Sequence, residues 1–159
     1  MTNHKLVPDD AALLSFIREV RELPSKNNVV LATGCFDIIH RGHISLLEQA
    51  SMRGWLMVGV NSDRAVKLLK GKGRPVHNQD DRCYVLASLA CVHRAFVIDD
   101  VRVAEAIRLV QPNYWFKGGD YTMDSLDQSE VAAAKAAGTE IVIIPTLKGY
   151  STTATLKKL

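Results

Sequence analysis

Two histidines stand three positions apart around a glycine in the stretch GCFDIIHRGH, in a chain that has five histidines. Imidazoles at this spacing can share a metal ion, transfer protons or donate hydrogen bonds to a phosphate. The pair, His40 and His43, follows an apolar run, and Gly34 and Gly42 let a ligand approach the backbone. A plain structural interpretation also stays open, in which one histidine caps a helix and the other is exposed.

Metal binding is the rival chemical interpretation of this stretch. Asp37 offers a third donor beside the histidines, but neither a second carboxylate nor a cysteine cluster accompanies it. An anion site agrees better with the pattern, because His43 stands at the predicted start of a helix, where free N–H groups attract negative charge. We therefore expect no metal held by the protein alone.

Other polar, glycine-containing stretches could contribute to the same site. KLLKGKGRP (67–75) is either a solvated loop or a mobile cationic loop that closes over a polyphosphate. KGGDY (117–121) is either a simple turn or a place where a ligand meets the backbone. GYSTT (149–153) is either a plain N-cap or a second anion site. VNSD (60–63) gives a weaker signal of the same kind.

The elements that must position these stretches alternate along the chain. Apolar runs and helical stripes predict strands and helices in turn. The expected strands are 29–33, 55–60, 94–98, 114–116 and 140–144. The expected helices are 10–22, 43–53, 62–69, 79–91, one capped by Asp99 and Asp100 that ends at Val110, one from about 129 to Ala137, and one from Ser151 onward.

Short apolar strands separated by helices indicate a parallel sheet covered on both faces. We predict an α/β fold with a doubly wound, Rossmann-like, five-stranded parallel sheet. Ligands of such sheets bind beyond the carboxyl ends of the strands. The polar stretches follow the first, second, fourth and fifth predicted strands, so they should meet at one edge. The chain contains neither a G-x-G-x-x-G fingerprint nor a P-loop, which excludes the commonest phosphate-binding turns.

Length and composition limit the remaining possibilities. The 159 residues predict one domain, with a helix and linker over 1–27 and a catalytic core over 28–159. A net charge of +3 suits a small anionic substrate and is too weak for a nucleic-acid partner. Three scattered cysteines, no membrane-length apolar run and no signal-peptide layout favour a cytoplasmic protein without a membrane partner. A homodimer is compatible with the sequence.

The motifs together resemble the cytidylyltransferase-like nucleotidyltransferase superfamily. GCFDIIHRGH is similar to its Gly-x-Phe-Asp-x-x-His-x-Gly-His signature, and GYSTT to its Ser-Thr-Thr element. VNSD, LKGKGRPV, the Asp-Arg pair at 81–82 and FKGGDY narrow the resemblance to the adenylyltransferase domain of ADP-heptose synthesis proteins. Some members fuse this domain to a sugar kinase, for which 159 residues are too few, so we expect the stand-alone form.

This resemblance implies that a sugar 1-phosphate attacks the α-phosphorus of a nucleoside triphosphate, with ATP and a heptose 1-phosphate as the expected pair. The implied catalytic residues are His40, His43, Lys70 and Lys72. The implied nucleotide-binding residues are Thr33, Gly34, Cys35, Phe36, Gly42, Asn61, Lys117, Gly118, Asp120, Tyr150, Ser151, Thr152 and Thr153. Asp37, Arg74 and Arg82 are expected at the acceptor, and Mg²⁺ is expected to arrive with the nucleotide.

Three alternatives remain at this point. Cytidylyl transfer to glycerol 3-phosphate or a similar polyol phosphate would use the same histidines and the same Ser-Thr-Thr element. A nucleotide-binding sensor without catalysis would use the same sheet edge. A metal-dependent hydrolase would use Asp37 with both histidines.

Overall fold

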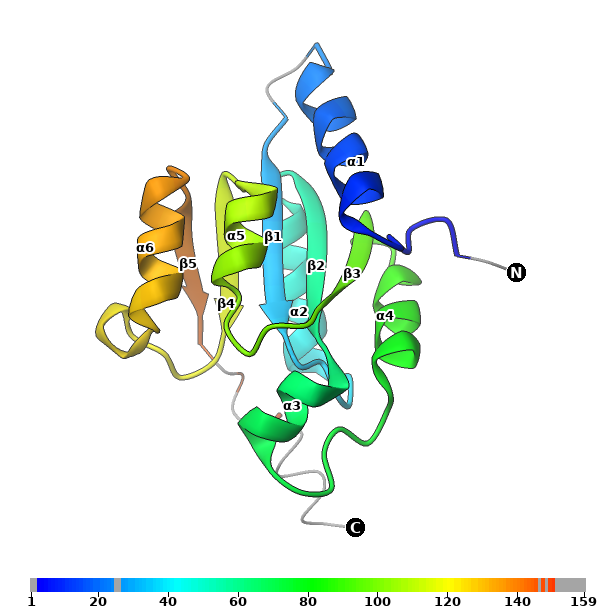
Figure 1. The fold of residues 1–159 in the computed structure, drawn as a ribbon, viewed down its shortest axis with the longest axis vertical. Coiled ribbons are helices and arrows are strands. Elements are labelled where there is room, and N and C mark those ends of the chain that lie inside the picture. Colours follow the sequence, from blue (N-terminus) through cyan, green and yellow to red (C-terminus); the bar gives the residue numbers. More distant parts are fainter. Residues whose placement is uncertain (1–2, 25–26, 146, 148, 151–159) are drawn as a thin grey trace.

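A single parallel sheet forms the centre of the molecule (Figure 1). The structure is a computed structural model that describes residues 3–24, 27–145, 147 and 149–150. The strand order is β3-β2-β1-β4-β5, and every neighbouring pair is parallel. The strands are β1 (Val29–Gly34), β2 (Trp55–Asn61), β3 (Arg94–Ile98), β4 (Tyr114–Gly118) and β5 (Glu140–Ile144). The predicted five-stranded, doubly wound sheet is thus confirmed.

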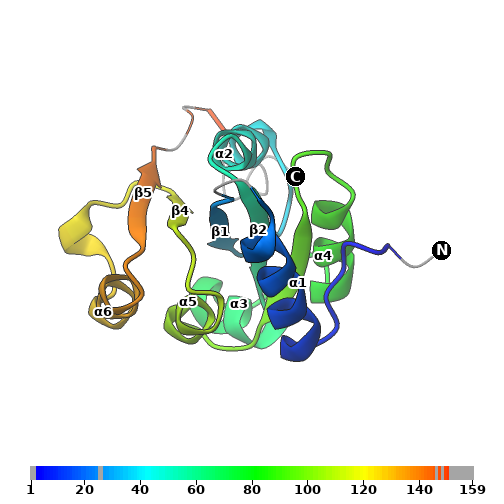
Figure 2. The same ribbon diagram turned by 90° about the horizontal axis from the view of Figure 1, so that it is seen from above.

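Helices cover both faces of this sheet, as Figure 2 shows from above. One face packs against α2 (Arg41–Ser51) and α4 (Gln79–Ala87), and the other packs against α1 (Asp10–Glu22), α5 (Ala104–Val110) and α6 (Gln128–Ala136). The short helix α3 (Asp63–Lys70) follows β2 at the carboxyl edge, and a 3-10 turn η1 (Met123–Ser125) precedes α6.

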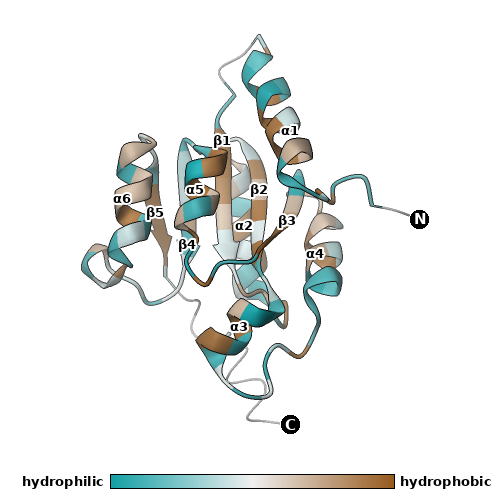
Figure 3. Cartoon of the chain, in the orientation of Figure 1, coloured by the Kyte–Doolittle hydropathy of each residue, from teal (hydrophilic) through white to brown (hydrophobic). Residues whose placement is uncertain are grey.

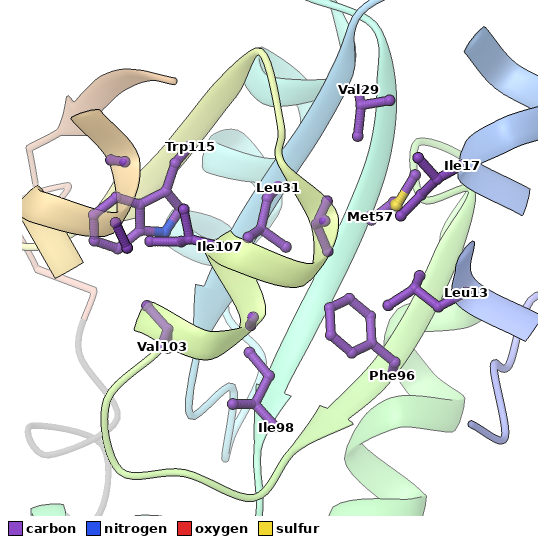
Figure 4. Close-up of a cluster of buried hydrophobic side chains, with 14 of the residues drawn as sticks. Leu13, Ile17, Val29, Leu31, Met57, Phe96, Ile98, Val103, Ile107 and Trp115 are labelled. Carbon is purple, nitrogen blue, oxygen red and sulfur yellow. The ribbon is translucent and has the colours of Figure 1, made fainter. Parts of the chain in front are cut away.

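The core consists of two apolar layers that share the strands. Successive strand residues point to opposite faces, so Leu31 belongs to the layer under α5 while Val30 belongs to the layer under α2. Figure 4 shows the first layer, in which Trp115 and Ile107 meet Leu31. Because both faces are covered, β1, β2, β3 and β5 carry mainly hydrophobic colours in Figure 3.

The N-terminal residues belong to this same core. In α1, the stripe Leu13, Phe16, Ile17 and Val20 is buried, as its helical spacing predicts. Ahead of it, the backbone at 5–7 pairs with Ala95 and extends the sheet beyond β3. The helix that precedes the expected catalytic core therefore packs into the same apolar layer as the strands. Among the described helices, none combines the length and apolarity needed to cross a membrane.

Three helix boundaries differ from the sequence prediction. Helix α2 begins at Arg41, since His40 itself is the N-cap. Helix α4 ends at Ala87, because short-range turn hydrogen bonds then lead the chain toward β3. The prediction that Asp99 caps α5 is wrong: α5 begins at Ala104, and Asp99 instead forms an ion pair with Arg64. The helix expected from Ser151 lies outside the described residues.

Candidate functional site

A cavity of about 480 Å³ opens at the carboxyl ends of the strands, a size typical of small-molecule sites. It lies where the strand order reverses, because β1 is followed in sequence by β2 on one side and neighbours β4 on the other. The predicted residues that line it are Thr33, Gly34, Cys35, Phe36, Asp37, His40, Gly42, His43, Asn61, Lys70, Arg74, Lys117, Gly118 and Tyr150.

His40 both caps α2 and lines the cavity. Its backbone is extended, and its Nδ1 accepts a hydrogen bond from the backbone N–H of His43 at 3.4 Å. A neutral imidazole whose Nδ1 accepts must carry its proton on Nε2. Burial lowers the pKa of His40, which favours this neutral form. The cap therefore fixes a tautomer with an N–H donor to offer a ligand.

His43 is held more tightly than His40. Its ring stacks on the ring of His40, with centroids 3.8 Å apart, and the ring of Phe36 meets it edge-on. Burial, followed by the charge of a protonated His40, lowers the pKa of His43 to about 4. Its Nδ1 is buried and has no hydrogen-bond partner among the described atoms. A buried polar atom of this kind is a candidate contact for a ligand.

The turn between β1 and α2 has a strained backbone. Phe36 adopts φ 45°, a left-handed conformation that is uncommon for a bulky residue. Its buried ring lies against both His43 and Gly34. A Cβ on Gly42 would lie 3.1 Å from the ring of His40 and 3.6 Å from the Cβ of Tyr150. Small residues at this turn therefore let the histidine pair and Tyr150 approach the start of α2.

Asp37 anchors the far end of the basic loop. Its carboxylate accepts hydrogen bonds from Arg74 Nε at 2.5 Å and from the backbone N–H groups of Val76 at 2.7 Å and His77 at 3.2 Å. The side chain is only 1% exposed. Burial raises the pKa of Asp37, but these donors outweigh it and lower the pKa overall. The expected acceptor contacts, Asp37 and Arg74, thus neutralise each other at the cavity wall.

Arg82, expected at the acceptor, lies away from the cavity. The Arg82 side chain is 1% exposed and does not line the cavity. Its guanidinium donates to the backbone oxygens of His77 and Cys35, at 3.0 and 2.5 Å, and to the carboxylate of Asp63 at 2.7 Å. Arg82 therefore ties the loop, the β1–α2 turn and α3 together behind the site.

The two lysines of the basic loop occupy different positions. Lys70, the last residue of α3, lines the cavity. Lys72 is exposed and is not part of the lining, which departs from its expected catalytic position. Gly71 and Gly73 flank it with φ 90° and 83°, and a Cβ on either would meet no atom within 4 Å. Lys72 thus stands at an unpacked tip beside an anchored loop end.

Lys117 lies at the opposite side of the cavity, at the end of β4. Its Nζ pairs with Glu130 of α6 at 2.5 Å and lies 4.8 Å from the ring centre of Tyr121. Asp120, expected beside Lys117 at the nucleotide, is exposed and does not line the cavity. The turn of KGGDY directs one of its two charged side chains to the site and the other to solvent.

Polar and thiol groups at the ends of β1 and β2 complete the floor. Thr33 accepts a hydrogen bond from Trp115 Nε1 at 2.9 Å. Asn61 is buried, with its Oδ1 3.9 Å from the sulfur of Cys35. Burial raises the pKa of the Cys35 thiol, so the thiol remains protonated and uncharged near neutral pH. These groups support the site without adding charge.

Several lining residues carried no recognisable sequence signal. Glu130 stands in an alanine-rich helix, and Arg102 and Val103 stand in a loop that the sequence places in a helix. Leu147 is a further member of this group, whereas the lining residue Tyr121 belongs to the KGGDY stretch. Ser151, Thr152 and Thr153 lie outside the described residues, so their predicted nucleotide contacts stay predictions.

The site's donors suit an anion better than a resident metal. Among the described residues, no cluster of three or more His, Cys, Asp or Glu side chains could hold a metal ion. Asp37, the carboxylate that the metal interpretation combines with the histidines, already accepts from Arg74 and two backbone amides. The arrangement can instead hold a polyphosphate against the imidazoles, Lys70 and the first turn of α2.

The family of the chain follows from its sequence as a whole. Residues 31–156 match the cytidylyltransferase-like family, so the chain belongs to that family. It is accordingly an enzyme of the nucleotidyltransferase class. The resemblance carried by GCFDIIHRGH and its companion motifs is thereby confirmed.

Particular relatives share most of this chain. Proteins named Bifunctional protein HldE are 37% identical over 147 residues in Aliarcobacter butzleri and 43% identical over 126 residues in Hyphomonas neptunium. These matches cover 89% and 79% of this chain but 30% and 26% of the relatives. The chain thus spans less than a third of the length of these relatives.

Solved structures share the same fold. The lipopolysaccharide core biosynthesis protein from Thermoplasma volcanium has a TM-score of 0.62 at 26% identity, over 78% of this chain and 98% of that chain. The pantoate-beta-alanine ligase from Francisella tularensis has a TM-score of 0.60 at 15% identity, over 97% of this chain and 72% of that chain. The second likeness concerns the fold alone.

Proposed function

We propose that the protein transfers the adenylyl group of ATP to a heptose 1-phosphate, giving an ADP-heptose and pyrophosphate. The product would serve surface polysaccharide assembly. The observation that carries the proposal is the stacked pair of neutral histidines at the start of α2, on the wall of the cavity at the strand switch point. Pairing with a sugar phosphate is supported by the resemblance of FKGGDY and LKGKGRPV to the heptose branch and by the solved lipopolysaccharide core relative.

The reaction needs positioned positive charge more than a protein nucleophile. An oxygen of the acceptor phosphate forms a bond to the α-phosphorus of ATP. The bond from that phosphorus to the bridging oxygen breaks, and pyrophosphate leaves with the electron pair. Because the acceptor attacks directly, no covalent enzyme intermediate is involved.

Residues of this chain stabilise the negative charge that develops on the phosphates during adenylyl transfer. The Nε2–H of His40 donates to a phosphate oxygen, and the ring of His43 provides the second contact. The ammonium of Lys70 faces the same phosphates. Lys72 reaches them when the loop tip at Gly71 and Gly73 moves inward. Asp37 keeps Arg74 and the remainder of the loop in place during this movement.

Mg²⁺ enters this proposal only as a companion of the triphosphate. The described residues supply no carboxylate cluster that would form a protein-made cage for it. Mg²⁺ usually retains waters and phosphate ligands in such sites and neutralises phosphate charge when bound. The steps assigned above to the histidines and lysines do not depend on its position.

The test is a matrix of nucleotides and acceptors with chromatography of the products. ATP, CTP and GTP are each offered with a heptose 1-phosphate, with other sugar 1-phosphates and with glycerol 3-phosphate. We expect ADP-heptose to form fastest. Faster turnover of CTP with glycerol 3-phosphate would overturn the substrate assignment and leave the nucleotidyl transfer standing. Tight nucleotide binding without any product would support the sensor alternative instead.

A further inference from the structure

Glu130 is a buried acidic residue in the lining of the cavity. It is 3% exposed and projects from the first turn of α6 into the cavity lining. A carboxylate is rarely buried this deeply unless it is paired. One of its oxygens accepts from the Nζ of Lys117 at 2.5 Å, and the other accepts from the backbone N–H of Val103 at 3.2 Å.

These contacts fix three elements with one side chain. Helix α5 has no side-chain cap of its own, because its N-cap is Val103. The Glu130 carboxylate accepts from the N–H of this N-cap residue and at the same time holds the end of β4 through Lys117. Its place in the first turn of α6 is favourable for a negative charge. The position of the carboxylate is therefore strongly determined.

The two ends of the cavity consequently differ in charge. At the α2 end, Lys70 has no ion pair with a described residue, and the histidine rings are uncharged donors. At the α6 end, the positive charge of Lys117 is cancelled by Glu130 at contact distance, and the lining residue Arg102 pairs with Asp127 at 3.1 Å. Apolar and aromatic side chains stand beside this pair, among them Val103 and Tyr121. Such an end suits an uncharged, ring-containing part of a ligand.

We infer that Glu130 determines the orientation of the nucleotide by masking the charge of Lys117. This inference rests on the proposed function. A triphosphate that meets two cationic ends could bind in either direction, and only one direction presents its α-phosphorus to the acceptor. With Lys117 masked, the triphosphate is directed to the α2 end and the nucleoside to the α6 end. Glu130 is thus a specificity-determining residue that never touches the reacting atoms.

The variant Glu130→Gln separates this role from a purely structural one. The amide of the variant keeps an acceptor for the N–H of Val103 but no longer neutralises Lys117. Binding of inorganic tripolyphosphate, measured by calorimetry without any acceptor, should tighten about tenfold, the size of one added charge-assisted contact. The kcat for adenylyl transfer should fall while the KM for ATP falls or stays constant, because misoriented ATP occupies the site.

Two further variants serve as controls. Glu105→Gln removes one negative charge from the exposed face of α5, where Glu105 pairs with Arg108, and should leave tripolyphosphate affinity within about twofold. The double variant Glu130→Gln/Lys117→Met removes both charges of the pair, and its tripolyphosphate affinity should return to the wild-type value. A tightening that survives in the double variant would overturn the inference, as would unchanged or weaker binding in a folded Glu130→Gln protein.

The unmodified protein provides an independent test if Glu130→Gln does not fold. It should bind one tripolyphosphate, at the α2 end, and a stoichiometry of two would contradict the masking of Lys117. These binding measurements involve no turnover. An absence of ADP-heptose synthesis would therefore refute the proposed function while the binding data still decide the role of Glu130.

Discussion

The two ends of the cavity use positive charge in opposite ways. At the α2 end, the histidines and Lys70 face the cavity without an ion-pair partner among the described residues. At the α6 end, Lys117 is fully engaged with Glu130. Both ends stand at the carboxyl edge of one sheet, so the fold alone does not distinguish them.

The two ends differ because their side chains have different structural partners. Lys117 and Glu130 hold β4, α5 and α6 together, and Lys117 is thereby no longer free to bind an anion. His40 caps α2 with one ring nitrogen and keeps the other available. A lysine beside a cavity is therefore not by itself a phosphate ligand, since its counter-ion within the fold decides its role.

The largest effect is expected at the α2 end. His40→Ala and His43→Ala should each lower kcat by about 10²–10³, or ~2.7–4 kcal/mol, because each removes a donor to the transition state. ATP affinity should change far less. Steady-state kinetics combined with equilibrium binding of ATP separates the two quantities.

Capping requires its own control, because His40 also stabilises the start of α2. Asn is a strong N-cap, so His40→Asn should restore the melting temperature that His40→Ala loses. It should not restore kcat. Recovery of turnover in His40→Asn would mean that His40 acts only as a cap.

At the α6 end, replacing the charged residue Lys117 should lower the stability of the protein more than it lowers kcat. Lys117→Met leaves the buried carboxylate of Glu130 without its partner, and we expect a loss of about 3 kcal/mol in unfolding free energy. Adding Glu130→Gln should restore much of that loss, since no buried charge then remains. Urea denaturation of the two variants tests this, and equal stabilities would show that the pair contributes little.

The histidine pair should also make stability depend on pH. The pKa of His43 is 6.5 when exposed and about 4 in the folded protein, so the unfolded chain binds the extra proton first. The free energy of unfolding that the neutral His43 contributes is complete above pH 6.5 and is lost as the pH falls toward 4. At about 1.4 kcal/mol per pKa unit, the loss is on the order of 3 kcal/mol.

Urea denaturation between pH 7.5 and 4 measures this loss. His40 and His93, whose pKa values are also lowered, titrate in the same direction. The non-titrating variant His43→Gln therefore serves as the reference, and its stability should fall less over this range. Parallel curves for the two proteins would contradict the lowered pKa of His43.

The smallest effect concerns the loop beside the α2 end. The amide of Gly71 still bonds to the oxygen of Lys67 at the end of α3, and the amides of Val76 and His77 are bonded to Asp37. Hydrogen exchange should therefore be fast at Lys72 and Gly73 between them and become slower with ATP and Mg²⁺, by about tenfold if ordering contributes roughly 1.4 kcal/mol. The amides of Val76 and His77 should be protected in both states. Equal exchange at Lys72 and Gly73 with and without nucleotide would exclude a closing tip.

The α2 end was largely predictable from sequence, because its residues are local. His40, His43 and Gly42 lie within four positions of one another, directly after a strand. The rules for strand ends and helix starts then suffice to place them. The five strands were predictable for a similar reason, since burial on both faces leaves an apolar run that can be read directly.

The α6 end was not predictable, because it depends on a pairing between distant positions. Lys117 and Glu130 come from different elements, and a single glutamate in an alanine-rich helix normally indicates a solvated position. Arg82 shows the same dependence on distant partners. The family resemblance implies an acceptor contact for Arg82, but three acceptors from other parts of the fold hold its guanidinium.

A crystal structure with a non-hydrolysable ATP analogue tests the division of the cavity most directly. We predict that the α- and β-phosphates lie within hydrogen-bond distance of His40, His43 and the first-turn amides of α2. The nucleoside should lie toward Tyr121, with the Lys117–Glu130 pair intact. A triphosphate bound to Lys117, with the nucleoside at the histidines, would contradict both the assigned orientation and the masking role of Glu130.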